Sequence, residues 1–253
     1  MKNRIIKLFL IFIVGIVYSS TTAKKYYHFD LSYCLNDNEI AIRKLNRTTG
    51  KINEKKYIYS LEKKDKIDYI IFNNEKYLLL SCDDLFFLYN NQNNLEFQGT
   101  TFGSITDEFS CFFSEMMQSS YLQEGKNKYT AEKMNGYSIG NPWVEGAEGN
   151  GIGEWLSRYV SSNSNIYISI GFVDYNRPYL YSQNSRPKKI ALYLDNEFIK
   201  YIELKDTPNF QKIEIPKDKK GVAKFVIEDV YKGSKFPNDT CINMFFYEPG
   251  NMD

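Results

Sequence analysis

The sequence predicts a mainly β protein with two β domains, and three observations lead to this fold class. Of its 253 residues, 21 are tyrosine and 18 are phenylalanine, and aromatic and β-branched residues favour strands. Short apolar runs recur along the chain, separated by Asn, Asp and Gly turn signals. No long helical period interrupts about the last hundred residues. We therefore expect a small antiparallel N-terminal domain followed by a β-sandwich or jelly roll.

Composition excludes some classes of partner. The chain has 32 Lys and Arg against 31 Asp and Glu, which leaves a formal net charge of +1. A nearly neutral chain offers no electrostatic footprint for nucleic acid or for an anionic membrane surface. Its length is sufficient to bury a sizeable core.

Residues 1–23 have the pattern of a secretory signal peptide. Basic side chains within residues 1–7 precede an apolar stretch over 8–18, and small residues lead to an expected cleavage after Ala23. The apolar stretch is shorter than the roughly twenty residues that a spanning helix needs, although a retained membrane anchor remains the alternative. We expect an exported protein, periplasmic, cell-surface or secreted, with no transmembrane segment in the mature chain.

Four cysteines, an even number in a chain expected to be exported, permit two disulfides in three connectivities. Their spacing does not choose among these. The disulfide candidates are Cys34, Cys82 and Cys111. Cys241 lies in an expected core strand and is the expected free thiol.

The N-terminal domain is expected over residues 24–118 as a meander of short strands. Turn-forming Asn and Asp residues, such as Asn73-Asn74, separate its apolar runs. The expected strands are 56–60, 67–72, 77–82 and 85–89. A short helix is expected over Glu108–Met117, and the domain boundary follows it.

The C-terminal domain is expected over 119–248. A single helical turn over 129–134 with Thr130 as its cap leads into strand after strand. Period-two alternation places Ile190, Leu192 and Leu194 on one face, as it does Ala223, Phe225 and Ile227. The expected strands are 166–173, 189–194, 197–204, 211–215, 222–230 and 241–247.

The most unusual stretch, residues 141–155, contains both tryptophans and a cluster of glycines. Glycines permit positive φ and close backbone approach, while Trp143 and Trp155 supply large flat surfaces. These rings either brace a sandwich corner or, with Glu145 or Glu154 beside them, present a ligand platform. The glycines lack the Lys-Ser/Thr of a phosphate-binding loop.

A single histidine, His28, lies near the expected mature N-terminus and limits the catalytic possibilities. It leaves no paired-histidine zinc site and no evident Ser-His-Asp arrangement. A carboxylate-pair hydrolase stays open, because several acids could converge. These acids are Glu145, Glu154, Asp174, Glu228, Asp229 and Asp239.

Two long excursions between strands, residues 171–186 and 229–241, would meet at one end of a sandwich whose strands alternate in direction. Loops on a rigid scaffold often carry binding residues. Aromatic faces stack on sugar rings, and Asp, Asn and Arg bind hydroxyls. The same side chains could instead hold the loops in place. With the tryptophan loop, the ligand-binding candidates are Trp143, Glu145, Asp174, Tyr175, Asn176, Tyr179, Arg186, Tyr231 and Asp239.

Several separated motifs, in order, resemble a bacterial discoidin-like family. This is the factor 5/8 type C, galactose-binding-like jelly roll related to the translocation, glycan-binding domain of streptococcal NAD glycohydrolase. The resemblance covers about 119–248. The motifs are Tyr121–Tyr129, Pro142–Gly146 with Gly151–Trp155, Ile170–Phe172, Asn184–Lys189, and Asp229–Gly233 with Asp239–Ile242.

The resemblance implies a jelly roll whose loops at one end bind carbohydrate, without the catalytic domain. Many such folds hold a structural Ca²⁺ through loop oxygens and a late-strand Glu. This chain reads Met134-Asn-Gly136 where relatives often have Asp-Gly, and Asn243-Met244 where they often have Ser-Glu. Structural calcium is therefore doubtful, and no other cofactor is expected.

The expected function is that of an exported, non-enzymatic carbohydrate-binding or surface-interaction protein, with a glycan or a cell-surface protein as its partner. Two alternatives remain at this point. One is a protein-binding or structural envelope module without sugar binding, and the other is a carboxylate-dependent glycan hydrolase.

Overall fold

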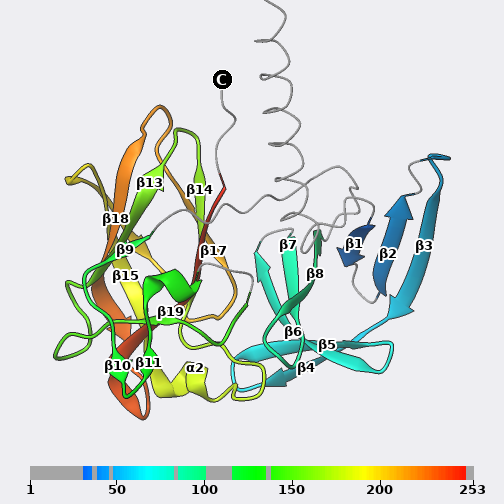
Figure 1. Cartoon of the computed structure of the whole chain (residues 1–253), viewed down its shortest axis with the longest axis horizontal. Helices are drawn as coiled ribbons and strands as arrows, with labels where there is room; N and C mark the ends of the chain where they lie inside the picture. Colours follow the sequence, from blue (N-terminus) through cyan, green and yellow to red (C-terminus); the bar gives the residue numbers. More distant parts are fainter. Residues whose placement is uncertain are drawn as a thin grey trace, which may run out of the picture.

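The computed structural model describes residues 31–35, 39–45, 48–82, 85–100, 116–134 and 138–248. In these residues the chain builds three layers of β-sheet, seen side by side in Figure 1. The N-terminal sheet forms one layer. The C-terminal strands form the other two, which we call the middle sheet and the outer sheet. The mainly β fold class expected from the sequence is confirmed.

The N-terminal sheet has eight strands, antiparallel except where β1 and β8 pair in parallel at Cys34 and Thr100. Two of the expected strands, 67–72 and 85–89, have the expected bounds. The expected strand at 56–60 is wrong, because β3 ends at Ile58 and β4 begins at Ser60. In sheet order the strands are β3 (Ile52–Ile58), β2 (Glu39–Leu45), β1 (Leu31–Leu35), β8 (Leu95–Thr100), β7 (Leu85–Tyr89), β6 (Glu75–Cys82), β5 (Ile67–Phe72) and β4 (Ser60–Lys64).

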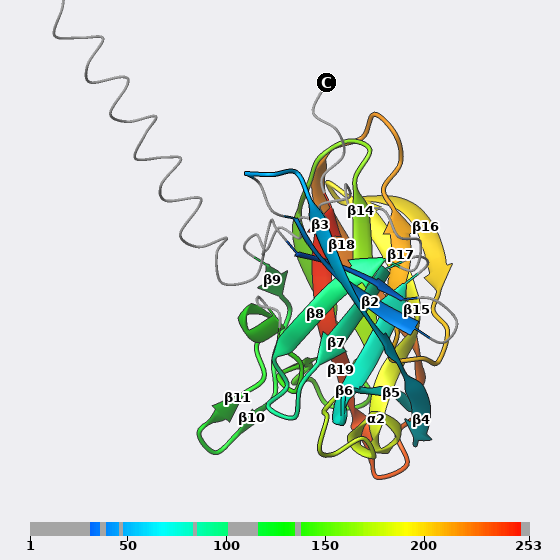
Figure 2. The same cartoon turned by 90° about the vertical axis from the view of Figure 1, so that its right-hand side faces the viewer.

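This sheet curls over itself, as the crossing of β2 and β3 over the other strands in Figure 2 shows. Tyr57 of β3 packs on Phe72 of β5 with ring centroids 6.0 Å apart, although these strands lie near opposite ends of the sheet order. Ile40, Phe86 and Leu88 complete the cluster inside the curl. The curl gives the short N-terminal strands an apolar core of their own.

Apart from a hairpin over residues 123–128, the C-terminal strands form one nine-stranded sheet that folds into two layers. The middle sheet contains β17 (Gln211–Glu214), β14 (Asn165–Ile170), β19 (Phe236–Glu248) and β12 (Trp143–Val144). The outer sheet contains β9 (Met117–Gln118), β13 (Trp155–Val160), β18 (Gly221–Tyr231), β15 (Asn184–Leu194) and β16 (Glu197–Glu203). A short parallel contact between β15 and β19 joins the layers.

Two hairpins confirm the turn signals in the sequence. Asn73 and Asn74 have φ of 51° and 62° between β5 and β6, and Asp195 and Asn196 have φ of 48° and 70° between β15 and β16. Positive φ at both central residues gives the turn a twist that matches the flanking strands. Asn and Asp tolerate this left-handed region better than most residues.

The sandwich core lies between the middle and outer sheets. Ile190, Leu192 and Leu194 of β15 meet alternate residues of β14, such as Ile166 and Ile168. Ala223, Phe225 and Ile227 of β18 lie in the same cluster, as the period-two pattern predicts. Burial of this contiguous apolar cluster is the main favourable contribution to the sandwich.

A second core lies between the N-terminal and middle sheets. Tyr167 of β14 and Phe246 of β19 stack with centroids 5.0 Å apart on the face opposite the sandwich core. Phe87 of β7 packs against Phe246 at 5.9 Å. The two central strands β14 and β19 are therefore covered on both faces, and the N-terminal sheet shares an apolar core with the sandwich.

Short elements flank the sandwich. They are the hairpin β10 (Gln123–Glu124) and β11 (Asn127–Lys128), the 3₁₀ turn η1 (Ala131–Met134) and the helix α2 (Leu180–Gln183). Among them, β10, β11 and α2 lie at the end of the sandwich at the bottom of Figure 1. The turn η1 confirms the helical turn expected over 129–134. Most of the helix expected over Glu108–Met117 lies outside the described residues, and its last residue, Met117, is in β9. None of the helices in the described part of the chain is long and apolar enough to span a bilayer.

The cysteines are only partly described. Cys241 is a buried free thiol in β19, and burial raises the pKa of this thiol. Cys82 is buried at the end of β6. The side chain of Cys34 and all of Cys111 lie outside the described residues, so the expected disulfide pairing among Cys34, Cys82 and Cys111 stays a prediction.

Candidate functional site

The tryptophan loop is interior. Trp143 is fully buried, and its Nε1 donates to the carbonyl of Ser120 at 2.8 Å. Glu145 is buried beside it, where its carboxylate accepts the amides of Ala147 at 2.9 Å and Thr240 at 3.3 Å. A ring without exposed surface cannot stack on a ligand. The ligand-platform interpretation of Trp143 is thus corrected to a bracing role, the other alternative for this loop.

The second tryptophan lies apart from the first. Trp155 is half-buried on the outer sheet, with the ammonium of Lys224 5.3 Å from its ring. Glu154 beside it accepts the hydroxyls of Ser119, at 2.6 Å, and Ser120. The 141–155 stretch therefore divides between the interior and the face of a sheet.

Asp174 organises the loop after β14. Its Oδ1 accepts the amides of Asn176 at 2.9 Å and Arg177 at 2.8 Å, and its Oδ2 accepts Arg177 Nη2 at 2.9 Å. Asn93 of the β7–β8 turn adds a further bond to Oδ2 at 3.2 Å. Burial alone would raise the pKa of this carboxyl, but the Arg177 hydrogen bonds and charge hold it below its ordinary value. Asp174 braces the loop.

Tyr175 and Asn176 face the N-terminal sheet. The Tyr175 hydroxyl donates to the carbonyl of Lys76 at 2.9 Å, and its ring packs edge-on against Tyr69 at 5.4 Å. Asn176 Nδ2 donates to the carbonyl of Asn91 at 2.8 Å. These two sugar-binding candidates instead fasten two layers together.

Arg186 is also interior, with 5% of its surface exposed. It pairs with both oxygens of Asp206, at 2.8 and 3.0 Å, and Nη1 donates to the carbonyls of Tyr181 and Asn184. Its guanidinium lies 5.0 Å from the Tyr181 ring and 5.8 Å from the Tyr231 ring. All three guanidinium nitrogens are thus engaged within the protein.

A pocket of about 380 Å³ lies between these loops and the short elements at the end of the sandwich. Of the nine sequence-derived candidates, Asp239 alone lines it; Tyr179 is exposed but lies outside its lining. The apolar lining is Leu122, Val144, Phe172, Leu180 and Phe236 with the ring of Tyr129, and the polar lining is Glu124, Asn127, Lys133, Asn141, Arg177, Asn184 and Asp239, together with Gly140.

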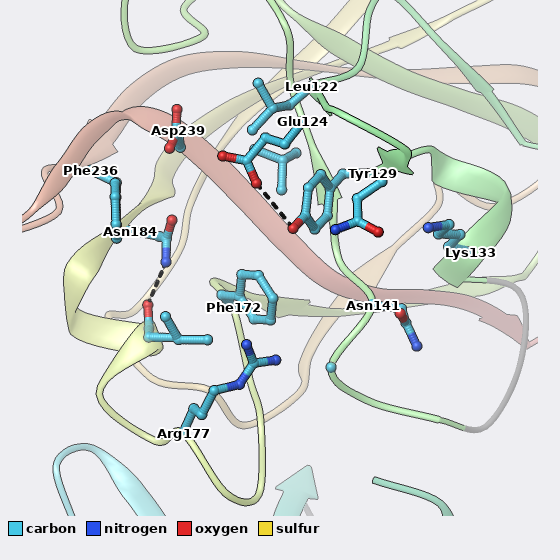
Figure 3. A pocket seen from close by; sticks show the side chains of 14 residues that line it. Leu122, Glu124, Tyr129, Lys133, Asn141, Phe172, Arg177, Asn184, Phe236 and Asp239 are labelled. Carbon is cyan, nitrogen blue, oxygen red and sulfur yellow. Dashed lines mark hydrogen bonds between the residues drawn. The ribbon is translucent and has the colours of Figure 1, made fainter.

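An aromatic pair forms one wall of the pocket, as Figure 3 shows. The Tyr129 ring packs edge-on against Phe172 at 6.3 Å, and its hydroxyl donates to Glu124 at 3.2 Å. The Lys133 ammonium lies 5.9 Å from the Tyr129 ring, and the Arg177 guanidinium 5.8 Å from the Phe172 ring. The pocket combines flat apolar surface with both signs of charge.

Two carboxyl groups in or near the pocket have raised pKa values. Burial raises the pKa of Asp239, and the nearby charge of Glu124 raises it further. Burial likewise raises the pKa of Glu145 behind the pocket wall, although its bonds from Ala147 and Thr240 oppose the shift. These acids take up protons more readily than ordinary carboxyls do.

Sequence reasoning missed most of the pocket residues. Glu124, Tyr129, Phe172 and Phe236 come from segments far apart in the chain, and only the closed end of the sandwich brings them together. A signal existed, because Tyr121–Tyr129 is one of the motifs that carry the family resemblance. No periodicity or spacing singles out its individual side chains.

The calcium expectation is tested only through the acidic side chains and the Asn243 position. None of them forms a group of three or more His, Cys, Asp or Glu side chains that could hold a metal ion. Where relatives often have Ser-Glu, Asn243 is buried and donates through Nδ2 to Ser169 Oγ at 3.0 Å. Residues 135–137 of the other departure lie outside the described residues.

Three of the other expected acids are already engaged. Asp229 pairs with Lys188 at 2.6 Å, Asp174 with Arg177, and Glu154 with two serine hydroxyls. Pairing of this kind stabilises the ionised carboxylate, whereas a general acid needs a raised pKa. In the pocket, the carboxyl with a raised pKa is Asp239.

By its fold the C-terminal part is a two-layer β-sandwich domain, with a polar and aromatic pocket among the loops at one end. The chain belongs to the NAD glycohydrolase translocation F5/8 type C domain family, whose model matches residues 109–247. The resemblance expected from the sequence over about 119–248 is confirmed. The family model describes a translocation domain of NAD glycohydrolase.

Solved structures of similar fold share little sequence with the chain. The family 32 carbohydrate-binding module of Clostridium perfringens NanJ, solved with galactose, is 13% identical with a TM-score of 0.39, over 53% of this chain and 93% of that one. The mycobacterial arabinofuranosyltransferase AftD is 10% identical with a TM-score of 0.37, over 55% of this chain and 11% of that one.

A third structure, the M60 catalytic domain with two CBM51 domains of C. perfringens ZmpB, is 8% identical with a TM-score of 0.31, over 85% of this chain and 25% of that one. These likenesses say nothing of what this chain binds. Among curated proteins, none matches the chain.

Proposed function

We propose that the chain is a non-catalytic carbohydrate-binding protein whose pocket holds a sugar. The observation that carries this proposal is the make-up of the pocket. The carboxylates of Glu124 and Asp239 and the cations Lys133 and Arg177 surround an aromatic wall in a concave site of about 380 Å³. Membership of the F5/8 type C family supports the same function.

Sugar recognition would divide between two kinds of side chain. Phe236, with 36% of its surface exposed, offers a face for the apolar side of a pyranose ring, while the largely buried Phe172 contributes only to the pocket lining. Carboxylates accept hydrogen bonds from hydroxyls, while guanidinium and amide groups donate to them. Affinity at one site is expected to be weak, because each new hydrogen bond replaces one to water.

A glycan array tests the proposal directly. The purified chain is screened with calcium and with a chelator, and we expect binding to a defined sugar class that chelation leaves unchanged. Phe236→Ala and Asp239→Asn should each weaken the signal without lowering the unfolding midpoint. Glu197→Gln, on an exposed hairpin outside the pocket lining, is the matched control. A blank array from folded protein would overturn the sugar-binding proposal and favour a protein partner.

The non-catalytic part of the proposal has its own test. Glu124 and Asp239 are a carboxylate pair in one pocket, so a hydrolase would release products from the glycan that binds. We expect intact glycan after prolonged incubation. Product that appears with the wild-type chain and disappears with Asp239→Asn would identify a glycan hydrolase instead.

We further propose that the protein acts outside the cytoplasm. The support is the positive, apolar and small-residue sequence of residues 1–23. N-terminal analysis of the protein recovered from outside the producing cells should find Lys24 as the first residue. Material found only in the cytoplasm with residues 1–23 attached would contradict this proposal.

A further inference from the structure

The solvent side of the outer sheet carries a row of aromatic side chains that are not part of the pocket lining. Alternate residues of β15 and β18 point into the sandwich core, so their neighbours point outward. The outward residues that matter here are Trp155, Tyr159, Tyr193, Phe198 and Tyr201, with Lys224. We call this set the aromatic face.

The aromatic face is continuous across four strands. On β15 and β16, Tyr193 packs edge-on against Phe198 at 5.6 Å, and Phe198 lies 4.9 Å from Tyr201. On β18, the Lys224 ammonium lies 5.9 Å from the Tyr193 ring and 5.3 Å from the Trp155 ring of β13. The contacts thus run from β13 to β16 without a break.

Three of these rings are exposed to solvent. Tyr159 is 57% exposed, Tyr201 55% and Phe198 45%. The middle sheet, in contrast, has its far face covered by the N-terminal sheet. A contiguous exposed apolar patch of this kind marks an interaction site more often than single exposed residues do.

Positive charge lies among the rings. Lys224 forms no ion pair with any described residue, and its ammonium is instead held between two aromatic faces. Lys189, next to the face, lies 4.2 Å from the Tyr201 ring and 3.7 Å from the exposed carboxylate of Glu203 at the sheet margin. Lys224 thus places positive charge among the rings, and the acid that pairs with Lys189 lies on the edge strand β16.

This charge pattern discriminates between occupants. The centre of a protein–protein interface is usually depleted of lysine, because burying an unpaired ammonium is costly. A ligand with flat apolar faces and negative groups would use both features of the surface. Sugar rings supply such faces, and carboxylate or phosphate groups would pair with the ammonium of Lys224.

We propose that the aromatic face is a second binding site, independent of the pocket, for an extended anionic polysaccharide. Its sugar rings stack on Phe198, Tyr201 and Trp155, and its acidic groups meet Lys224. Uronate carboxylates and sugar phosphates share this chemistry. This second site would recognise the negative charge and the length of the polysaccharide, whereas the pocket of about 380 Å³ holds a single small ligand.

Affinity electrophoresis of the full chain tests the site. The gels contain polygalacturonate, its methyl-esterified neutral counterpart, or a phosphate-bearing polysaccharide. We expect retardation by at least one anionic gel and weaker retardation by the neutral one. Failure of every anionic polysaccharide to retard the folded chain overturns the proposal.

Variants separate the roles of stacking and charge. Phe198→Ala with Tyr201→Ala should weaken retardation about tenfold, since it removes two of the three stacking rings. Lys224→Gln should reduce retardation in the anionic gel to the level of the neutral gel. Circular dichroism confirms folding of each variant.

Two controls keep the outcome specific. Leu61→Ala removes a side chain that is 62% exposed on β4 of the N-terminal sheet, and it should change nothing. Phe236→Ala in the pocket should also leave retardation unchanged, which keeps this site distinct from the proposed function. Equal retardation of the wild type and the double variant would overturn the proposal, as would stronger binding to a single-stranded oligonucleotide than to every polysaccharide.

Discussion

Asp174 and Arg186, which lie within residues 171–186 but outside the pocket lining, differ from the pocket residues Asp239 and Lys133 in how fully they are bonded. In the loop, Asp174 uses both carboxylate oxygens and Arg186 all three guanidinium nitrogens. In the pocket, the Asp239 carboxylate makes no hydrogen bond within the described residues, and the Lys133 ammonium only lies near a ring. Polar groups whose hydrogen bonds are all made within the protein stabilise the fold, whereas polar groups without such bonds can form them with a ligand.

The largest expected change in stability comes from breaking the ion pair of Arg186. Asp206→Asn leaves the buried guanidinium of Arg186 without its carboxylate and also removes the ion pair with Lys66 of the β4–β5 turn. We expect the free energy of unfolding to fall by about 3 kcal/mol, since breaking a buried pair strands a charge. Urea unfolding followed by tryptophan fluorescence measures it. Asp229→Asn, in an exposed pair with Lys188, is the control and should change little.

A backbone change in the same loop should have the next largest effect. Gly171 has a φ of +86°, and a Cβ there would lie 2.7 Å from the Tyr181 ring and 3.0 Å from Arg186 Cδ. Gly171→Ala should cost about 2 kcal/mol from left-handed strain and overpacking. Gly149→Ala, also at positive φ but with open space around it, isolates the strain alone. Equal losses in the two variants would show that the crowding is unimportant.

In the pocket, stability and binding should separate. Asp239→Asn removes an acceptor that hydroxyls would use, so we expect sugar affinity to fall about tenfold, in line with roughly 1.5–3 kcal/mol for a hydrogen bond to a charged group. The free energy of unfolding should stay the same or rise slightly, because burial disfavours the ionised carboxylate. Calorimetric titration and urea unfolding provide the two measurements. A large loss of stability would place Asp239 with the bracing residues.

The smallest expected effect is an opposite pH dependence in the two regions. The pKa of Asp239 is raised above its usual 3.8, so its contribution to stability declines as pH rises through that raised value. For Asp206, burial would raise the pKa, but Arg186 and Lys66 hold it below 3.8. Its contribution is present above 3.8 and is lost as pH falls through the lowered value.

Unfolding midpoints measured in a pH series should separate these contributions. The decline at rising pH should shrink in Asp239→Asn, while the loss at low pH should shrink in Asp206→Asn. Sugar binding should weaken as pH falls through the raised pKa of Asp239, because protonation removes the charged acceptor. A pH-independent affinity would exclude Asp239 from ligand binding.

Much of the fold could be predicted from local signals. The strand bounds at 67–72 and 85–89, the hairpin turns at Asn73-Asn74 and Asp195-Asn196, and the inward faces of β15 and β18 follow from short-range pattern. The strand β13 was missed, because Trp155 at its start was interpreted as part of the glycine-rich loop. Strands β1 and β2 were missed because mixed polar sequence hides their period.

The candidate site could be predicted only as a location. The sequence analysis predicts binding at one end of the sandwich, which is where the pocket lies. Its individual candidates, among them Trp143, Glu145, Asp174 and Arg186, follow only from the chemical types of their side chains. Their types suit a ligand and an internal brace equally well. Which role a polar side chain has depends on whether other segments satisfy it, and sequence spacing carries no such information.

By itself, the sequence determined the β class, the order of most C-terminal strands and the family of the domain, since these depend on local propensity, turn chemistry and motifs. Only the tertiary structure decided that the N-terminal sheet covers the far face of the middle sheet, because Tyr167 and Phe246 need a partner surface from distant strands. It also decided that Asp239 lines a pocket while Arg186 does not. Long-range packing sets burial, and burial decides whether a polar group holds the fold together or meets a ligand.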